Sequence, residues 1–224
     1  MLLRAPLLAL ALAAVSLPAA GWAQAAPDAA PDAAAPAQSE RAQRAAEDIV
    51  LGNADAPLTI VEYASFTCSH CGAFHRDVFP KLKAEYVDTG KVRFIQRDIY
   101  FDAVALWAGI LSRCEPGRFY TVGGMILDEQ ADWLKSNASG EDLAEGLRKI
   151  GLRAGMDGEA IQACWDDRGF VEALVGAFQT NAEADKIDAT PTFIIGGQKV
   201  PNQNWDSMKK IIDAKLAEAE GNKG

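Results

Sequence analysis

Two cysteines separated by two residues follow an apolar run that has the composition of a strand. Residues 60–71 read Ile-Val-Glu-Tyr-Ala-Ser-Phe-Thr-Cys-Ser-His-Cys, and apolar residues then recur at helical spacing. This order places Cys68 at or near the start of a helix, where free backbone amides and the helix dipole favour an anion. The pattern therefore predicts a reactive Cys68 thiolate, with Cys71 one turn further along as the buried resolving thiol.

A C-x-x-C pair has three common uses: haem attachment, half of a zinc site, and redox exchange. Haem attachment requires His directly after the second cysteine, and position 72 is Gly. A zinc site requires two more ligands, yet His70 and His75 are the only histidines and no second C-x-x-C exists. We therefore expect a redox-active Cys68–Cys71 disulfide with no metal and no cofactor, and a purely structural disulfide is the alternative.

Two neighbouring side chains are candidates to assist the cysteines. His70 lies between them and is expected to donate toward the Cys68 sulfur, although an exposed turn residue is the simpler interpretation. Glu62 interrupts the apolar strand and shares a face with Leu58 and Ile60. A carboxyl buried there would have a raised pKa and could carry the Cys71 proton, directly or through water. The alternative is a carboxylate that reaches solvent at the strand end.

Composition limits the class of protein and its compartment. The chain has 224 residues, 49% of them hydrophobic, and a net charge of −9, which argues against nucleic acid as a partner. Residues 1–23 have the basic start, short apolar core and small-residue exit of a secretory signal, with cleavage after Ala23 or Ala25. The alternative, an uncleaved anchor, has too short an apolar core. We expect a bacterial periplasmic protein whose residues 24–46 form a disordered Ala/Pro-rich leader.

The remaining sequence predicts an α/β fold with a helical insertion. A short edge strand within 48–52 precedes strand 58–64, a helix bent or restarted at Pro80, and strand 91–99, which together form a parallel βαβ unit. Residues 102–184 read as helices throughout. Strand 192–195, a Gly196-Gly197 turn, strand 198–200 and a closing helix complete the order βαβ, insertion, ββα. We divide the chain accordingly into 47–101, 102–184 and 185–224.

Three further residues are notable outside the C-x-x-C pair. Cys114 and Cys164 lie on apolar faces of two different helices of the insertion. With 4 cysteines in an oxidising compartment, a structural disulfide between them is favoured over two buried thiols. Pro191 opens the strand after the insertion, and the residues alone favour an ordinary trans peptide before it.

Taken together, these motifs resemble the DsbA family of periplasmic thiol–disulfide oxidoreductases. The resemblance covers about residues 47–219, and it rests on Glu62, the Cys68-Ser69-His70-Cys71 motif, the helical insertion and the segment Ala-Thr-Pro-Thr-Phe at 189–193. It implies a thioredoxin fold, a cis Pro191 facing the cysteines, and a Thr190 whose backbone pairs with an extended substrate. It also implies mixed disulfides between Cys68 and reduced secreted proteins, and reoxidation by a membrane quinone-linked partner.

The sequence departs from the best-known oxidases of that family at two positions that tune reduction potential and partner choice. Ser69 stands where they have Pro, and Thr190 stands where they have Val. An isomerase or reductase of the same fold is therefore an alternative, but residues 24–46 are too polar to form a dimerisation domain, which favours a monomeric oxidase. A periplasmic binding or chaperone module with structural disulfides is an alternative of another class, and in it Cys68→Ser would leave substrate oxidation unchanged.

Overall fold

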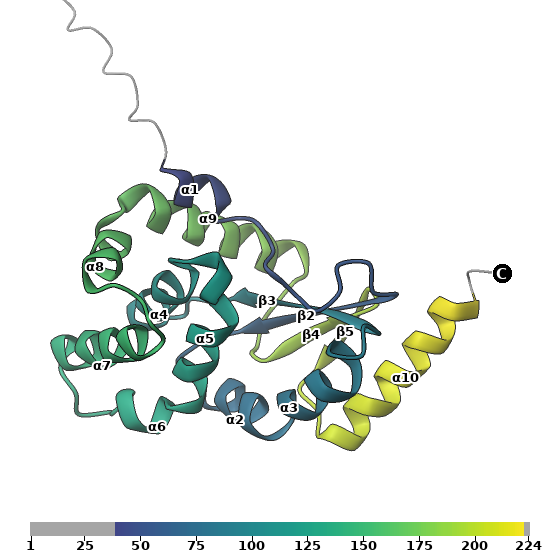
Figure 1. Ribbon diagram of the computed structural model, residues 1–224. Coiled ribbons are helices and arrows are strands. Elements are labelled where there is room, and N and C mark those ends of the chain that lie inside the picture. Colours follow the sequence, from purple (N-terminus) through teal and green to yellow (C-terminus); the bar gives the residue numbers. More distant parts are fainter. Residues whose placement is uncertain (1–38, 222–224) are drawn as a thin grey trace, which may run out of the picture. The chain divides into compact units, whose positions relative to one another are not determined.

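A five-stranded mixed sheet organises residues 39–221, the part of the chain that the computed structural model describes (Figure 1). The strands lie in the order β1-β3-β2-β4-β5. Their bounds are β1 Val50–Leu51, β2 Leu58–Ala64, β3 Val92–Asp98, β4 Thr192–Ile195 and β5 Gln198–Pro201. Only β2 and β3 are parallel, as the predicted βαβ unit requires, and the other pairs are antiparallel. Gly196 and Gly197 join β4 to β5 with positive φ angles of 55° and 82°, as the predicted hairpin turn requires.

Helices of the first and last parts of the chain cover one face of this sheet (Figure 1). They are α2 Ser69–Asp77, α3 Phe79–Leu82, which continues as a π-helical turn over Lys83–Val87, and α10 Trp205–Gly221. The break between α2 and α3 falls at Val78, two residues before Pro80, so the predicted restart is confirmed. The core between these helices and the sheet is aromatic, with Phe74 of α2 lying 4.7 Å from Phe193 of β4 between ring centroids.

The segment between β3 and β4 is helical, which confirms the predicted insertion and the fold class. Its elements are α4 Ala103–Arg113, a 3₁₀ turn at Pro116–Arg118, α5 Phe119–Asp128, α6 Gln130–Trp133, α7 Gly140–Arg153, α8 Gly158–Asp166 and α9 Arg168–Ala184. Side-chain caps begin several of these helices: Asp102 caps α4, Ser139 and Asp142 form a capping box on α7, and Asp157 caps α8.

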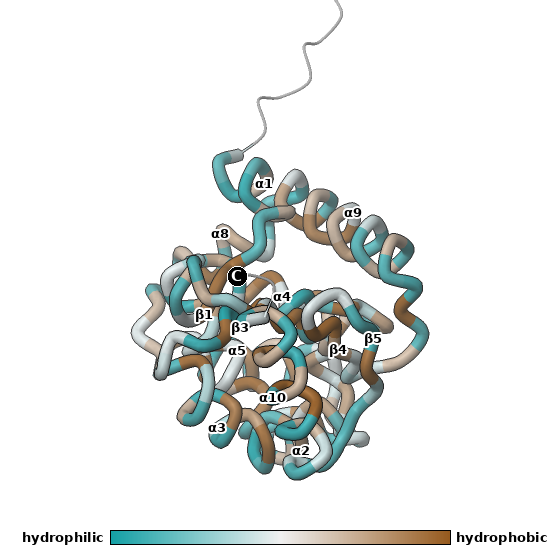
Figure 2. Tube along the Cα trace, turned by 90° about the vertical axis from the view of Figure 1, so that its right-hand side faces the viewer, coloured by the Kyte–Doolittle hydropathy of each residue, from teal (hydrophilic) through white to brown (hydrophobic). Residues whose placement is uncertain are grey.

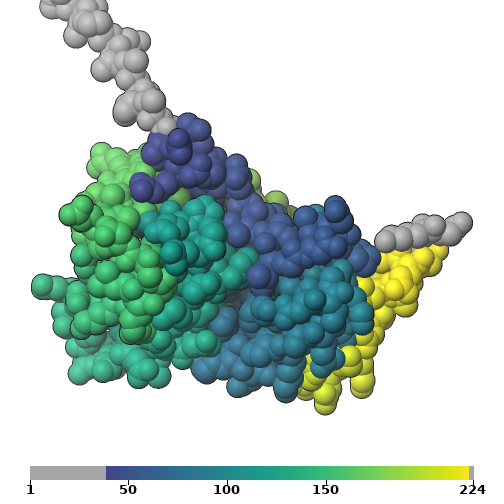
Figure 3. Space-filling view, in the orientation of Figure 1, coloured from purple at the N-terminus to yellow at the C-terminus, as the bar shows by residue number. Residues whose placement is uncertain are grey.

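The insertion does not form a separate compact unit, because residues 39–221 belong to one unit. Its helices surround their own core around Leu111, Val122 and Ile161, and Phe66 and Cys71 also belong to that core. Helix α9 lies across the second face of the sheet, where its Phe178 packs near Val61 (Figures 1 and 2). Figure 3 shows the teal and green surface of the insertion lying directly against the blue surface of the first part of the chain. The redox motif therefore stands where two cores meet.

A short helix corrects one sequence-based expectation. Residues 24–46 were expected to form a disordered leader, but α1 spans Glu40–Arg44. Ser39 caps this helix, and Ala42 and Ala45 are buried at 6% and 5% exposure, with Ala42 close to Gly169 at the start of α9. Alanine side chains are small enough to pack closely on another helix, which an Ala-rich composition conceals. The predicted signal at 1–23 and the rest of the leader lie outside the described residues.

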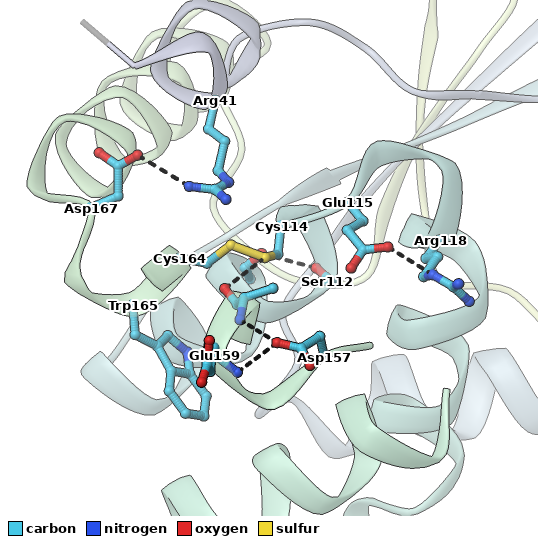
Figure 4. Close-up of a disulfide and its surroundings, with 12 residues drawn as sticks. Arg41, Ser112, Cys114, Glu115, Arg118, Asp157, Glu159, Cys164, Trp165 and Asp167 are labelled. Atoms are coloured by element: carbon cyan, nitrogen blue, oxygen red, sulfur yellow. Dashed lines mark hydrogen bonds and ion pairs between the residues drawn. A yellow bond between two sulfur atoms is a disulfide. The ribbon is translucent and has the colours of Figure 1, made fainter. Parts of the chain in front are cut away.

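A disulfide joins Cys114 to Cys164, 50 residues apart, as predicted (Figure 4). Cys114 follows α4 and Cys164 lies in α8, and both cysteines are at least 95% buried. By the loop-entropy argument, closing a loop of this length stabilises the folded state by about 4 kcal/mol. The bond thus holds the helices of the insertion together, and its sulfurs are separate from the C-x-x-C pair.

Candidate active site

Cys68 is the N-cap residue of α2, immediately before the first helical turn. Its backbone is extended, with φ −83° and ψ 118°, and its carbonyl accepts hydrogen bonds from the amides of Cys71 and Gly72 at 3.1 and 3.2 Å. No side chain caps this helix start. The Cys68 sulfur therefore occupies the place where a cap would lie, next to the helix amides, as the sequence predicted.

The surroundings of Cys68 stabilise its thiolate. The pKa of Cys68 falls from 9.0 to about 5, first because the Cys71 thiol donates a hydrogen bond to the sulfur. Partial burial acts in the opposite direction, whereas the Thr190 side chain and the amides of Cys71 and His70 lower the pKa further. Most Cys68 side chains are therefore ionised at neutral pH in the reduced protein.

Cys71 has the opposite environment. Its side chain is 0% exposed, and the Ser65 amide donates to its sulfur over 3.4 Å. The hydrogen bond to Cys68 and burial raise the pKa of Cys71 far above its usual value, and nearby Glu62 raises it further. One thiol is thus an accessible thiolate and the other is a buried, protonated thiol, which is the asymmetry that thiol–disulfide exchange uses.

Glu62 lies in the middle of β2, opposite Gln96 on β3 and Phe193 on β4. It is 2% exposed, and its Oε1 atom has no hydrogen-bond partner within the described residues. Burial raises the pKa of Glu62 from 4.5 to about 8, and the charges of Asp98 and Cys68 add to this effect. The predicted buried carboxyl with a raised pKa is confirmed, and the alternative, a carboxylate that reaches solvent, is wrong.

A buried ionic cluster lies beside Glu62. Asp98 of β3 accepts a 2.5 Å hydrogen bond from Arg113 of α4 and a 3.1 Å hydrogen bond from Gln96. Arg113 also donates to the Gln96 carbonyl over 3.0 Å, and the carboxyl and guanidinium side chains are only 2% and 9% exposed. The cluster joins the insertion to the sheet next to Glu62, the buried carboxyl whose charge raises the pKa of Cys71.

The Thr190–Pro191 peptide is cis and faces the cysteines. The trans default drawn from the residues alone is therefore wrong, whereas the conformation implied by the family resemblance is present. The Cys68 sulfur lies 3.4 Å from the Thr190 carbonyl oxygen, to which it donates a hydrogen bond only in its protonated form. Thr192, two residues later, closes the turn by donating its hydroxyl to the Ala189 carbonyl over 2.7 Å.

His70 acts on Cys68 through its backbone. Its amide is among the groups that lower the pKa of Cys68, whereas its side chain is exposed. Between residues 39 and 221, no hydrogen bond joins the His70 imidazole to the Cys68 sulfur. The role predicted for the imidazole therefore stays a prediction.

The thioredoxin family matches residues 44–214 of the chain, which include the whole sheet and the cysteine pair. The chain belongs to this family. Among curated thioredoxin relatives, a protein of Rickettsia bellii named as a protein-disulfide oxidoreductase is 33% identical over 175 residues, covering 77% of this chain and 66% of its own. The Bacillus subtilis protein named "Disulfide bond formation protein D" is 27% identical and covers 75% and 76%.

Solved structures agree with this thioredoxin-family membership. The alpha-DsbA1 structure of Wolbachia pipientis has a TM-score of 0.72 and 27% identity, and it covers 80% of this chain and 95% of its own. The chain is therefore DsbA-like within the thioredoxin superfamily. It spans only 61–66% of the length of two rickettsial relatives that it matches. None of the helices between residues 39 and 221 combines the length and apolar character needed to cross a bilayer.

Several residues around this thioredoxin-family site were not identified from the sequence. Thr67 donates to Asp102, the cap of α4, over 2.8 Å, and Gln130 donates to the Phe66 and Cys68 carbonyls. Asp98 and Arg113 were also missed. Each is a polar residue, for which exposure to solvent is the ordinary expectation. Each has a partner 15 to 64 residues away, and no local pattern reports such contacts.

Proposed function

We propose that this protein is a DsbA-like thiol:disulfide oxidoreductase that introduces disulfides into secreted proteins. The observation that carries the proposal is the pairing of a Cys68 thiolate, with a pKa of about 5, and a buried Cys71 thiol at the start of α2. A low pKa of the half-buried Cys68 thiol stabilises the dithiol form relative to the disulfide. A pair of this kind is a strong oxidant, because the stabilised thiolate makes reduction of its disulfide thermodynamically favourable.

In the proposed reaction the oxidised Cys68–Cys71 disulfide accepts two electrons from a substrate dithiol. A substrate thiolate attacks the Cys68 sulfur, the Cys68–Cys71 bond breaks, and Cys71 leaves and takes up a proton. The second substrate thiolate then attacks the substrate sulfur of the mixed disulfide, and Cys68 leaves as a thiolate. The products are a substrate disulfide and a reduced Cys68/Cys71 pair, with the protons of the substrate thiols passing to Cys71 and to solvent.

Nearby groups are proposed to assist each half of the reaction. Glu62 is neutral below about pH 8 and lies near Cys71, so it can supply the proton that the leaving Cys71 needs, directly or through water. Thr190 and Pro191 lie against Cys68, where the backbone of Thr190 can pair with an extended substrate. The exposed His70 side chain, two residues after Cys68, is proposed to stabilise the Cys68 thiolate.

The proposed setting follows from sequence features. The signal-like residues 1–23 support a periplasmic location, and the net charge of −9 gives no basis for a nucleic-acid partner. Reduced secreted proteins that contain cysteines are the proposed substrates. A membrane quinone-linked protein is the proposed reoxidising partner, and the protein is proposed to act as a monomer.

The direction of exchange is tested by the reduction potential of the Cys68–Cys71 pair, measured by equilibration with glutathione buffers. Alkylation and peptide mapping would follow Cys68–Cys71 separately from Cys114–Cys164. We expect a value of about −120 mV, like a strong oxidant of the DsbA kind. A value of about −270 mV, like that of thioredoxin, would contradict the oxidase assignment and indicate a reductase.

A further inference from the structure

Gln130, the first residue of α6, makes an unusual contact with the active-site turn. Its side-chain nitrogen Nε2 donates to the Phe66 carbonyl over 2.7 Å and to the Cys68 carbonyl over 3.0 Å. An amide group has two N–H donors, so both are used on two backbone acceptors in one turn. Gln130 is 7% exposed, and the interaction spans more than 60 residues of sequence. A side chain of the insertion therefore holds the backbone of the nucleophilic residue itself.

The position of Gln130 relative to the active-site turn is fixed by contacts that α6 and α2 each make with α5. In α6, Trp133 is 5% exposed and its indole N–H donates to the Ile126 carbonyl of α5 over 2.8 Å. On the facing side, α2 contacts the end of α5 through Arg76, which donates to the Leu127 carbonyl over 3.3 Å, and through His75, whose Nδ1 lies 2.9 Å from Asp128. The contacts of Arg76 and His75 hold helix α2 against α5, whereas Gln130 holds the turn that precedes α2.

Gly72 provides the space that this contact needs. A Cβ atom at position 72 would lie 2.2 Å from Gln130 Oε1 and 2.8 Å from its Cδ, and 3.0 Å from Nη1 of Arg76, so the Gln130 side chain meets it most closely. Any larger residue at position 72 would push the end of the Gln130 side chain away from the two carbonyls. The glycine directly after the C-x-x-C motif and the glutamine in α6 therefore form one structural unit.

The Cys68 carbonyl connects this unit to the chemistry. The same carbonyl accepts from the amides of Cys71 and Gly72, so its orientation determines how the first turn of α2 meets the nucleophilic residue. The amides of His70 and Cys71 then face the Cys68 sulfur and stabilise its anion. If the carbonyl is released, the turn can rotate and these donors lose their alignment with the sulfur.

We propose that Gln130 is a positioning residue of the redox site, which fixes the Phe66 and Cys68 carbonyls and so lets the helical insertion set the thiolate stability of Cys68. This inference rests on the proposed oxidoreductase function and deepens it. It assigns the insertion a role in tuning the cysteine pair, with Gly72 as the residue that admits the contact.

The test compares Gln130→Ala, Gly72→Ala and the double variant in the full-length protein. Thiolate absorbance gives the titration midpoint of Cys68, and equilibration with glutathione gives the dithiol–disulfide equilibrium constant. We expect each single variant to raise the midpoint by roughly half to one pH unit and to shift the equilibrium constant about three- to tenfold toward a weaker oxidant. The double variant should show no larger effect than the stronger single variant, because both changes remove the same contact.

Gly72→Ala separates positioning from general stability. Alanine favours a helix more than glycine does, which offsets part of the stability lost with the Gln130 hydrogen bonds. If that contact is purely structural, the Cys68 midpoint stays at the wild-type value whatever the melting temperature does. If Gln130→Ala fails to fold, Gly72→Ala alone decides the question. Gly176→Ala in α9, where an added Cβ meets nothing within 4 Å, and Gln162→Ala on the exposed side of α8 are the matched controls.

A wild-type midpoint and glutathione constant in Gly72→Ala would overturn the proposal, as would fully additive effects in the double variant. These measurements use glutathione and no protein substrate. Failure of the proposed oxidase function would appear elsewhere, as a wild-type protein with a thioredoxin-like potential. The two failures are therefore distinguishable.

Discussion

Replacing Cys71 by serine should make the mixed disulfide at Cys68 persistent. In the wild-type protein Cys71 is one helical turn away and hydrogen-bonded to Cys68, so it attacks any disulfide formed at Cys68 within the same molecule. Intramolecular attack of this kind is favoured by large effective concentrations. We expect the adduct between Cys68 and a peptide containing one cysteine to live at least about a hundredfold longer in Cys71→Ser.

The adduct is formed by activating Cys68 of the variant with an aromatic disulfide reagent and displacing the aromatic thiol with the peptide. Acid-quenched samples analysed by mass spectrometry then give its lifetime and its site. Cys68→Ser is the control, and it should form no adduct because Cys71 is 0% exposed and protonated. An adduct on Cys71 of the Cys68→Ser variant would reverse the roles assigned to the two cysteines. An equal adduct lifetime in the wild-type protein and in Cys71→Ser would contradict the resolving role of Cys71.

Replacing Glu62 by glutamine should slow the release of the Cys68 mixed disulfide by Cys71 and change the pH dependence of stability. Cys71 must lose a proton to attack and gain one when it leaves, and a buried thiolate without a proton partner is costly. Glu62 is the buried carboxyl whose charge acts on Cys71. We expect a decrease of at least about a hundredfold in the rate of the step that involves Cys71, the lower end of general acid–base contributions. Stopped-flow measurement with the single-cysteine peptide gives this rate.

The sign of the stability effect follows from the raised pKa of Glu62. The carboxyl titrates at about 8 in the reduced folded protein and at 4.5 when unfolded. Below pH 4.5 the carboxyl is neutral in both the folded and the unfolded protein, so it does not lower the free energy of unfolding. As the pH rises from 4.5 to 8 the carboxyl ionises in the unfolded protein but stays neutral in the folded one, and the free energy of unfolding falls. The difference corresponds to about 5 kcal/mol, so Glu62→Gln should become more stable than the wild-type protein by up to that amount across this range.

Urea unfolding of both reduced proteins at several pH values measures this difference. Glu183→Gln is a suitable control, because this exposed glutamate of α9 has no contact with the cysteine pair. A gap between Glu62→Gln and wild type that is the same at pH 4.5 and pH 8 would show that Glu62 titrates normally. A slower reaction of Cys71 in Glu62→Gln, and any constant difference in stability, would then require another explanation than a raised pKa of Glu62.

The sequence predicts those features of the site that depend on residues close together in the chain. Alternation of strand and helix placed Cys68 at a helix start, and a single carboxyl in an apolar strand identified Glu62. Both inferences use residues within about two turns of one another, and the structure confirms the resulting positions. The cysteine pair at 114 and 164 was also accessible, because an even number of cysteines on apolar helix faces suggests pairing.

Features that depend on distant contacts were not accessible in this way. Gln130 acts on carbonyl groups, which have no residue-specific signature, and Asp98 and Arg113 acquire meaning only when α4 packs on the sheet. The Thr190–Pro191 peptide is cis in the folded chain, whereas the isolated dipeptide favours trans, so the residues alone do not predict it. The helix at Glu40–Arg44 is too short for its period to be read, and burial on α9 stabilises it.

The most direct test of this account is the titration of the Cys68 thiolate in the reduced wild-type protein. Thiolate absorbance is followed against pH, and the signal of Cys68→Ser is subtracted. The hydrogen bond from Cys71, the Thr190 side chain and the helix amides predict a midpoint at about pH 5. A midpoint close to 9, the value of an ordinary thiol, would contradict the claim that the start of α2 activates this cysteine.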